Sequence, residues 1–260
     1  RVQIRETIRS HFQKEELLFS RGIKCLSLFF IDKVEYYRKY NELGEEINSE
    51  YGDIFEEEYN HLLEEYISIG DTAYSNYLKN IETSKTHTGY FSIDKDGRKV
   101  NSKTTRGSDI TDDVSAYDLI MKHKERLLSF EEPVRFIFSH SALREGWDNP
   151  NIFQICTLKQ GGTSTTNKRQ EVGRGLRICV DQSGNRMDYS LLGNEFEEIN
   201  QLTVIASEGY KDFVSSLQRE ITDVLYERPT KASIEYFEGK IIGAGDYKKI
   251  ITKEDATCIY

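Results

Sequence analysis

The chain has 260 residues, enough for one large domain or for one domain with a small appendage. Acidic residues outnumber basic ones by 44 to 35, and the formal net charge is −9. This charge excludes a strong overall attraction to nucleic acid or to an anionic membrane, and no apolar run is long enough to span a bilayer. Any phosphate site is therefore expected to be a local feature of the surface.

The cysteines are the next bound on function. Cys25, Cys156, Cys179 and Cys258 are far apart and form no Cys-x-x-Cys pair. Two of them, Cys25 and Cys156, lie inside apolar runs, which predicts buried free thiols and a reducing, cytoplasmic compartment. We find no signal peptide and no cluster with metal-ligand spacing, so we expect no metal site formed by this chain alone.

The first third of the chain alternates between helical and strand patterns. Apolar residues at helical spacing predict a helix over residues 1–19, and the run IKCLSLFFI at 23–31 predicts a buried strand. We predict a further helix over 34–40 and an acidic, solvated helix over 55–69. The many tyrosines of this region are interpreted as core residues, with a base-stacking platform as the alternative.

Residues 83–112 change in character, because Ser, Thr, Lys, Asp and Gly dominate there. The pair Asp96-Gly97 is typical of a tight turn, which predicts a small exposed hairpin inserted into the fold. This insertion contacts DNA or a partner, or it is a surface loop without a role. A helix is expected over 114–130.

Three short apolar runs in the second half predict core strands: VRFIF at 134–138, IFQICTL at 152–158 and LTVIA at 202–206. An amphipathic helix is expected over 210–225. Strands that alternate with polar loops and helices favour an α/β fold with a mostly parallel sheet, whose ligands bind at the carboxyl ends of the strands.

A basic stretch lies between the last two of these strands. Residues 159–177 carry five basic residues and one acidic residue. If residues 166–177 are helical, Gln170, Arg174 and Arg177 share one face, which suits a phosphate chain. Each glycine of the Gly-Arg-Gly sequence costs a helix about 1 kcal/mol, which favours close approach of a ligand or another chain. A solvated basic helix is the alternative.

Two motifs in this region resemble a known family. The sequence SALREGWDNPN at 141–151 resembles motif V, and QEVGRGLR at 170–177 resembles motif VI, of superfamily 2 helicases. The phrases FSHSALREGWDNPNIFQICTL, RQEVGRGLR, GIKCLSLFFIDKVEYYR and LTVIASEGY resemble the Res subunit of type III restriction enzymes. The resemblance covers about residues 1–227.

The resemblance implies a fold and a domain organisation. Residues 1–227 are expected to form the second RecA-like helicase domain, an α/β fold of the P-loop NTPase type that carries the insertion at about 83–112. Residues 228–260 are expected to be an extension or the start of a linker. Because the first residue is Arg1 and not methionine, we expect a piece of a longer protein.

The resemblance also implies roles for individual residues. Arg174 and Arg177 are expected to act catalytically as the arginine finger that neutralises charge on a transferred phosphoryl group. The resemblance implies nucleotide contacts from Gln170, Gly146, Asp148 and Gly173. It implies contacts to the DNA backbone from Ser139, His140, Ser141, Asp32 and Lys33.

Cofactors and partners follow from what the sequence lacks. It has no G-x-x-x-x-G-K-[ST] loop and no Asp-Glu box for magnesium. We therefore expect ATP and Mg²⁺ to be bound jointly with a first RecA-like domain of the same chain, and this chain alone to be inactive. It also lacks a nuclease site. The implied partners are DNA, that first domain and a modification (methyltransferase) subunit, with no membrane.

Three functions remain open at the level of the sequence. The first is the motor domain of a type III restriction endonuclease, which drives DNA translocation and cleavage. The second is the motor domain of another superfamily 2 DNA helicase or remodeller. The third is a non-catalytic nucleic-acid-binding module that keeps the fold without the motor.

Overall fold

The computed structural model divides the chain into two compact units, Arg1–Gly209 and Tyr210–Tyr260. We describe each unit separately. The residues that the structure describes are 1–93, 99–100, 126–140, 149–158, 169, 171–206, 212, 214–219, 221–222, 233–243 and 248–259.

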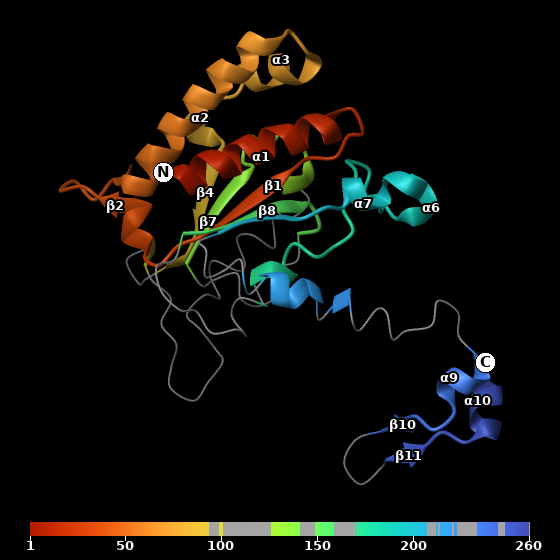
Figure 1. Ribbon diagram of the computed structural model, residues 1–260. Helices are drawn as coiled ribbons and strands as arrows, with labels where there is room; N and C mark the ends of the chain where they lie inside the picture. Colours follow the sequence, from red (N-terminus) through yellow and green to blue (C-terminus); the bar gives the residue numbers. More distant parts are fainter. Residues whose placement is uncertain are drawn as a thin grey trace. The chain divides into compact units, whose positions relative to one another are not determined.

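The first unit is built on a parallel sheet of five strands (Figure 1). Its spatial order is β4 (His87–Tyr90), β7 (Phe136–Ser139), β1 (Leu26–Phe30), β8 (Ile152–Thr157) and β9 (Thr203–Ile205). The three central strands are buried along their whole length, because a parallel sheet is covered on both faces. This is the RecA-like α/β class that the sequence predicts, and all three apolar runs of the second half are confirmed as strands.

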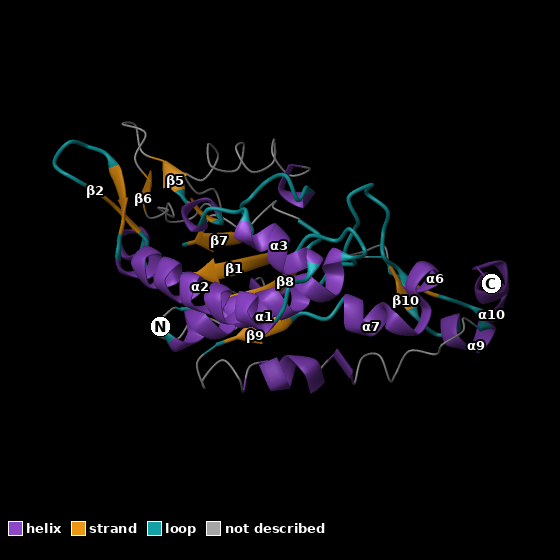
Figure 2. Ribbon diagram, turned by 90° about the horizontal axis from the view of Figure 1, so that it is seen from above, coloured by secondary structure: helices purple, strands orange, loops and turns teal. Residues whose placement is uncertain are grey.

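Two long helices cover one face of this sheet (Figure 2). They are α1 (Val2–Phe19) and α2 (Glu50–Ile69), and the short helix α3 (Ala73–Lys79) follows α2. Phe29 of β1 stacks on Phe138 of β7 with ring centroids 4.4 Å apart, and Phe55 of α2 packs edge-on to both rings. The helices predicted over 1–19 and 55–69 are confirmed, and most tyrosines of this region belong to the core or pack against it.

The other face of the sheet carries a second apolar cluster. Leu28 and Phe30 of β1, Ile137 of β7 and Ile155 of β8 belong to it. They pack with Leu127, which lies in the short 3₁₀ helix η3 (Arg126–Leu128). The expected helix over 114–130 lies outside the described residues except for this last turn.

The segment that follows β1 differs from the sequence prediction. A helix was expected over 34–40, but the chain forms a 3₁₀ turn, η1 (Val34–Tyr36), and then a strand, β2 (Arg38–Tyr40). Strand β2 pairs antiparallel with β3 (Glu46–Asn48). The helix prediction is wrong because pairing with β3 and burial of Tyr37 against Phe138 override the weak helical pattern of seven residues.

The expected insertion also differs in part from the structure. His87–Tyr90, inside the segment 83–112, forms the edge strand β4 of the main sheet, after the 3₁₀ turn η2 (Thr83–Lys85). The hairpin itself is present, with β5 (Ser92–Ile93) antiparallel to β6 (Lys99–Val100). The first compact unit ends at Gly209, and the domain boundary at 227 stays a prediction.

The remaining described elements are short. In the first unit, Val180 and Arg186 form a bridge around a tight turn, and α6 (Tyr189–Leu192), η5 (Gly193–Glu195) and α7 (Phe196–Ile199) follow. The second unit contains α9 (Ile234–Phe237), β10 (Ile241–Ile242), β11 (Lys249–Ile250) and α10 (Lys253–Ile259). Among the helices that the structure describes, none is long and apolar enough to cross a membrane.

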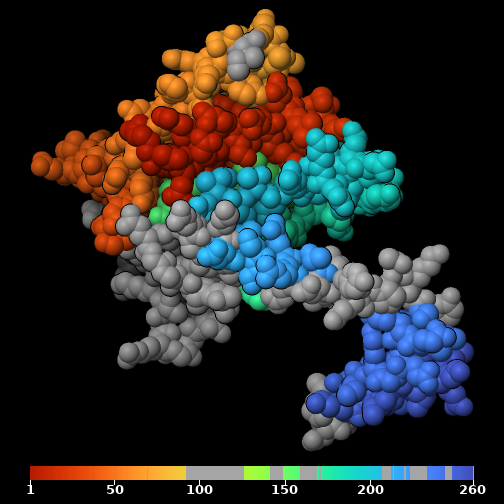
Figure 3. Space-filling view, in the orientation of Figure 1, coloured from red at the N-terminus to blue at the C-terminus, as the bar shows by residue number. Residues whose placement is uncertain are grey.

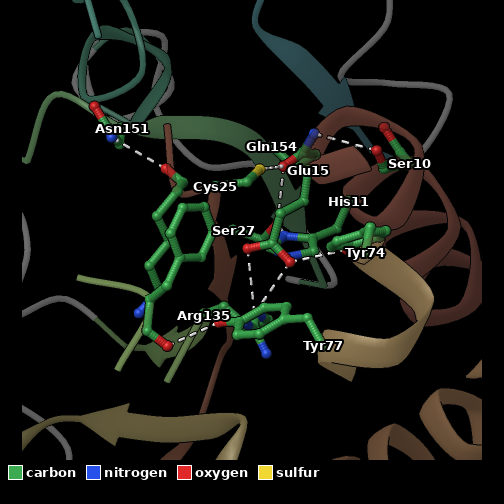
Figure 4. A network of polar contacts seen from close by, with 12 residues as sticks. Ser10, His11, Glu15, Cys25, Ser27, Tyr74, Tyr77, Arg135, Asn151 and Gln154 are labelled. Carbon is green, nitrogen blue, oxygen red and sulfur yellow. Dashed lines mark hydrogen bonds and ion pairs between the residues drawn. The ribbon is translucent and has the colours of Figure 1, made fainter. Parts of the chain in front are cut away.

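A buried polar network lies at the amino ends of the central strands (Figure 4). Arg135, directly before β7, lies 3.3 Å from the carboxylate of Glu15 on α1, and both side chains are fully buried. The hydroxyl of Tyr74 donates to the same carboxylate over 2.8 Å. His11 Nδ1 lies 2.8 Å from Ser27 Oγ of β1. The network therefore ties α1 and α3 to the start of the sheet.

Lys24 is a second buried charge at this edge. Its Nζ donates to the carbonyls of Ser129, over 2.8 Å, and of Glu132. Burial lowers the pKa of Lys24 to about 7, because the interior disfavours the charged ammonium. The sequence predicts a buried strand here but gives no sign that a lysine is enclosed within it.

Candidate functional site at the carboxyl edge of the sheet

The site predicted from the sequence lies where the central strands end. Phe30, the last residue of β1, pairs with Ser139 of β7 and with Thr157 of β8. The segments after these three strands therefore begin at one level of the sheet. Ligands of open α/β sheets bind at this edge. The structure thus brings Asp32, Lys33, Ser139 and His140 to the same edge.

Ser139 does not occupy the position expected of a DNA contact. Its side chain is fully buried, and Oγ forms no hydrogen bond with any described residue. Thr157 is also buried, and its Oγ1 likewise forms no hydrogen bond in the described part of the chain. Thr157 was not among the predicted site residues. Its position as a polar residue near the end of the apolar run 152–158 could have indicated it.

His140 and Asp32 are half-buried, and Lys33 is exposed. The Nζ of Lys33 lies 3.1 Å from the carboxylate of Glu35 and 5.5 Å from the ring centroid of Tyr36. The hydrogen bond to Glu35 raises the pKa of Lys33, so its ammonium is charged at neutral pH. A phosphate at this position must compete with the Glu35 carboxylate for that charge.

The motif VI helix ends earlier than the sequence predicts. The described residues 169 and 171–173 are helical, and a turn follows, in which the amide of Arg174 donates to the carbonyl of Glu171 over 3.3 Å. Arg177 lies beyond this turn. The condition that the helix continues through Arg174 and Arg177 is therefore not met, and Gln170 lies outside the described residues.

The two arginines are nevertheless close together. Arg177 Nη1 donates to the backbone carbonyl of Arg174 over 2.8 Å, and both side chains are half-buried. This hydrogen bond positions the guanidinium of Arg177 against the turn. The arrangement places two cationic groups on one short segment without the helix that the spacing suggested.

The two glycines of motif VI have different reasons to be present. A Cβ at Gly175 would lie 2.4 Å from Cδ1 of Leu202, so the Leu202 side chain would have to shift to admit a larger residue beside the segment leading into β9. A Cβ at Gly173 would meet nothing within 4 Å, and Gly173 is exposed. Packing therefore explains Gly175, whereas the structure offers no packing reason for Gly173.

Asn151 connects segments that carry or adjoin both motifs, and it was not among the predicted site residues. Its Nδ2 donates to the carbonyls of Lys24, over 3.0 Å, and Val180, over 2.8 Å. Its Oδ1 accepts from the amide of Val180 over 2.8 Å. One buried amide thus joins the end of motif V, the start of β1 and the chain after motif VI.

Four predicted site residues lie outside the described residues. They are Gln170, Gly146 and Asp148 from the nucleotide set, and Ser141 from the DNA set. Across the part of the chain that the structure describes, no three His, Cys, Asp or Glu side chains form a group that could hold a metal ion. The described residues offer a set of polar groups at the carboxyl edge of the sheet and, on the motif VI turn, a pair of arginines. Guanidinium groups suit binding of an anion.

The sequence of this chain is similar to those of known proteins. No protein-family model matches the chain. The chain is 43% identical over 183 residues to the type III restriction-modification enzyme EcoP15I Res subunit of Escherichia coli, which covers 69% of this chain and 17% of the relative. It is 43% identical over 184 residues to the EcoPI Res subunit of Escherichia phage P1, with the same two shares.

A third relative extends the match. The chain is 34% identical over 242 residues to the StyLTI Res subunit of Salmonella typhimurium, over 84% of this chain and 22% of the relative. An α/β domain of the RecA-like class is thus similar to part of a larger enzyme subunit. The chain is homologous to the Res subunits of type III restriction-modification enzymes, and it spans about a fifth of their length.

Proposed function

We propose that this chain is the second RecA-like motor domain of a type III restriction endonuclease Res subunit. In this proposal it works with a first RecA-like domain, a modification subunit and DNA in the cytoplasm. The single observation that carries the proposal is the homology to Res subunits over the stretch that contains both motifs. The buried free thiols of Cys25 and Cys156 fit a reducing compartment.

Arg174 and Arg177 are proposed to neutralise charge that develops on the phosphoryl group of ATP when the two motor domains close. ATP bound with Mg²⁺ supplies the free energy for translocation. Their partial exposure leaves the guanidiniums accessible, and the bond from Arg177 to the Arg174 carbonyl holds the pair in place. Gln170, Gly146, Asp148 and Gly173 are proposed to contact the nucleotide.

The DNA backbone is proposed to run along the carboxyl edge of the sheet, near Asp32, Lys33, His140 and Ser141. Lys33 and His140 are accessible in the structure. Ser139 is buried, so its hydroxyl reaches a phosphate only if the surrounding segment moves. Such contacts hold the duplex without reading its sequence.

The test is DNA-stimulated ATP hydrolysis by the full-length protein, with Arg174→Ala and Arg177→Ala compared to wild type. Loss of an arginine finger is expected to reduce turnover by ~10³ to 10⁵ while ATP still binds. Arg186→Ala is the matched control, because Arg186 is exposed on the turn after motif VI and is given no role. Turnover that stays within twofold in both finger variants would reject the motor role of motif VI.

A further inference from the structure

The hairpin formed by β2 and β3, residues 37–49, is the feature that the proposed motor role does not use. We call it the hairpin arm. It leaves the sheet just after the carboxyl end of β1 and projects from the first unit (Figure 1 and Figure 3). A projecting two-stranded hairpin is marginal in water by itself. What holds this one in place is its root.

The first leg of the hairpin arm is fixed by Tyr37. Its ring is fully buried and stacks on Phe138 with centroids 4.2 Å apart. Its hydroxyl lies 2.7 Å from His87 Nδ1, and His87 Nε2 lies 3.1 Å from the carboxylate of Glu56 on α2. This chain of contacts connects the leg to both the sheet and the helix layer.

The second leg is fixed at the same point. Asn48 Nδ2 donates to the Glu56 carboxylate over 2.6 Å, and the amide of Ser49 donates to the carbonyl of Tyr37 over 3.1 Å. Across the hairpin, Arg38 Nε lies 3.2 Å from Glu46. The first leg reaches Glu56 through His87 and the second reaches it directly, so the hairpin arm cannot swing without breaking these buried and partly buried hydrogen bonds.

The tip of the hairpin arm also has a fixed shape. Asn41 Oδ1 accepts from the amides of Leu43, over 3.0 Å, and Glu45, over 2.9 Å. Gly44 has φ +77°, which a glycine adopts without strain. The turn presents Leu43 at its end with 82% of its surface exposed. A rigid arm thus holds an exposed leucine away from the core.

The charge of the tip decides what can bind it. Glu42 and Glu45 flank Leu43 and are exposed, whereas Glu46 is paired with Arg38. Carboxylates at this position repel the phosphates of DNA and of anionic lipids. A protein surface with an apolar pocket and a rim of lysine or arginine matches both the leucine and its acidic neighbours.

We propose that the tip of the hairpin arm, residues 41–46, docks into such a basic-rimmed apolar pocket on another protein domain or subunit. The fixed tip reduces the ordering cost of binding. Burial of one leucine accounts for about tenfold to a hundredfold in affinity, so Leu43 is expected to be the main contact.

The first experiment identifies the occupant. The photo-crosslinking residue p-benzoylphenylalanine replaces Leu43 in the full-length protein, which is mixed with its modification subunit and duplex DNA and irradiated. We expect a cross-link to a protein peptide, mapped by mass spectrometry, with apolar residues and nearby Lys or Arg. Three results would overturn the proposal. They are cross-links to DNA alone, cross-links to a peptide without basic neighbours, and a cross-linking yield no greater than that of the same probe placed at Leu191.

Leu191 is a suitable control because it is another exposed leucine, at 61%, on helix α6. The second experiment measures the dissociation constant for the cross-linked partner. Leu43→Ala is expected to weaken binding about tenfold to a hundredfold. Glu42→Lys is also expected to weaken binding, and its effect should be larger at low salt than at high salt because salt screens the charge. Leu191→Ala is expected to leave it unchanged. Equal effects of Leu43→Ala and Leu191→Ala would reject the docking role.

This test is independent of the motor proposal. Arg174→Ala is expected to abolish ATP hydrolysis without changing the cross-link from position 43. Failure of the cross-link with intact ATP hydrolysis therefore rejects only the docking role of the hairpin arm, and the reverse result rejects only the motor role.

Discussion

The two edges of the central sheet use polar residues in opposite ways. At the amino edge, Glu15, Arg135 and Lys24 are buried, and each has a partner within the fold. At the carboxyl edge, the hydroxyls of Ser139 and Thr157 form no hydrogen bond with described residues. Buried charge in this domain therefore serves stability at the amino edge, while two buried hydroxyls at the carboxyl edge stay without a hydrogen bond among the described residues.

The pKa values support this division. Burial alone raises the pKa of Glu15, but the charge of Arg135 and the contacts of His11 and Tyr74 outweigh it and lower that pKa to about 2. The pairing is incomplete, because Arg135 Nη1 and His11 Nε2 make no hydrogen bond with any described residue, although His11 Nε2 lies 3.6 Å from the Glu15 carboxylate. The amino edge is nevertheless where loss of one partner leaves an unpaired charge in the interior.

The largest expected effect on stability is therefore at the amino edge. Arg135→Leu leaves the Glu15 carboxylate buried and unpaired, and is expected to lower the free energy of unfolding by about 3–5 kcal/mol. Urea denaturation measures it. The control is Arg9→Ala, which removes a surface pair with Glu6 and should cost at most about 1 kcal/mol. A loss in Arg135→Leu no larger than in this control would contradict the comparison.

Acid should act through the same pair. The pKa of Glu15 is lowered from 4.5 to about 2, so its stabilisation is fully present above pH 4.5 and is lost as the pH falls through 2. The lowered pKa of Glu15 corresponds to about 3 kcal/mol of unfolding free energy in all. The measurement is the pH dependence of unfolding free energy in wild type and in Glu15→Gln. We expect a flatter acid limb in the variant, and parallel curves would show that Glu15 is not the group that titrates.

The smallest effect is expected at the carboxyl edge. Ser139→Ala removes a hydroxyl that has no hydrogen-bond partner among the described residues, so the unfolding free energy should change by less than about 1 kcal/mol. Ser27→Ala at the amino edge is the matched comparison, because Ser27 Oγ contacts His11 and donates to Gln154 over 3.0 Å. It should cost about 1–3 kcal/mol. Equal costs in the two serine variants would remove the distinction between the edges.

Much of the candidate site was predictable because the relevant signals are local in sequence. The apolar runs around Leu28, Ile137 and Ile155 were each predicted to be a buried strand, and they form the three central strands of the sheet. Polar residues after those runs were expected at one edge, and the register between Phe30, Ser139 and Thr157 confirms that placement. The roles of the individual residues there remain predictions.

Other features depended on contacts between distant segments. The helix predicted over 34–40 gave way to the hairpin arm because Tyr37 packs on Phe138 and bonds to His87, fifty residues away. The helix of motif VI ends at Gly173, and the turn that follows brings Gly175 beside Leu202. Spacing along the chain carries no information about either partner.

By itself, the sequence determined the α/β class, the order of the motifs and the likeness to Res subunits, because periodicity and motif spacing are properties of short segments. Only the tertiary structure decided that Lys24 and Arg135 are enclosed, that Ser139 points inward, and that Arg177 is held by the carbonyl of Arg174. The physical reason is that burial and hydrogen-bond partners depend on which segments meet in space.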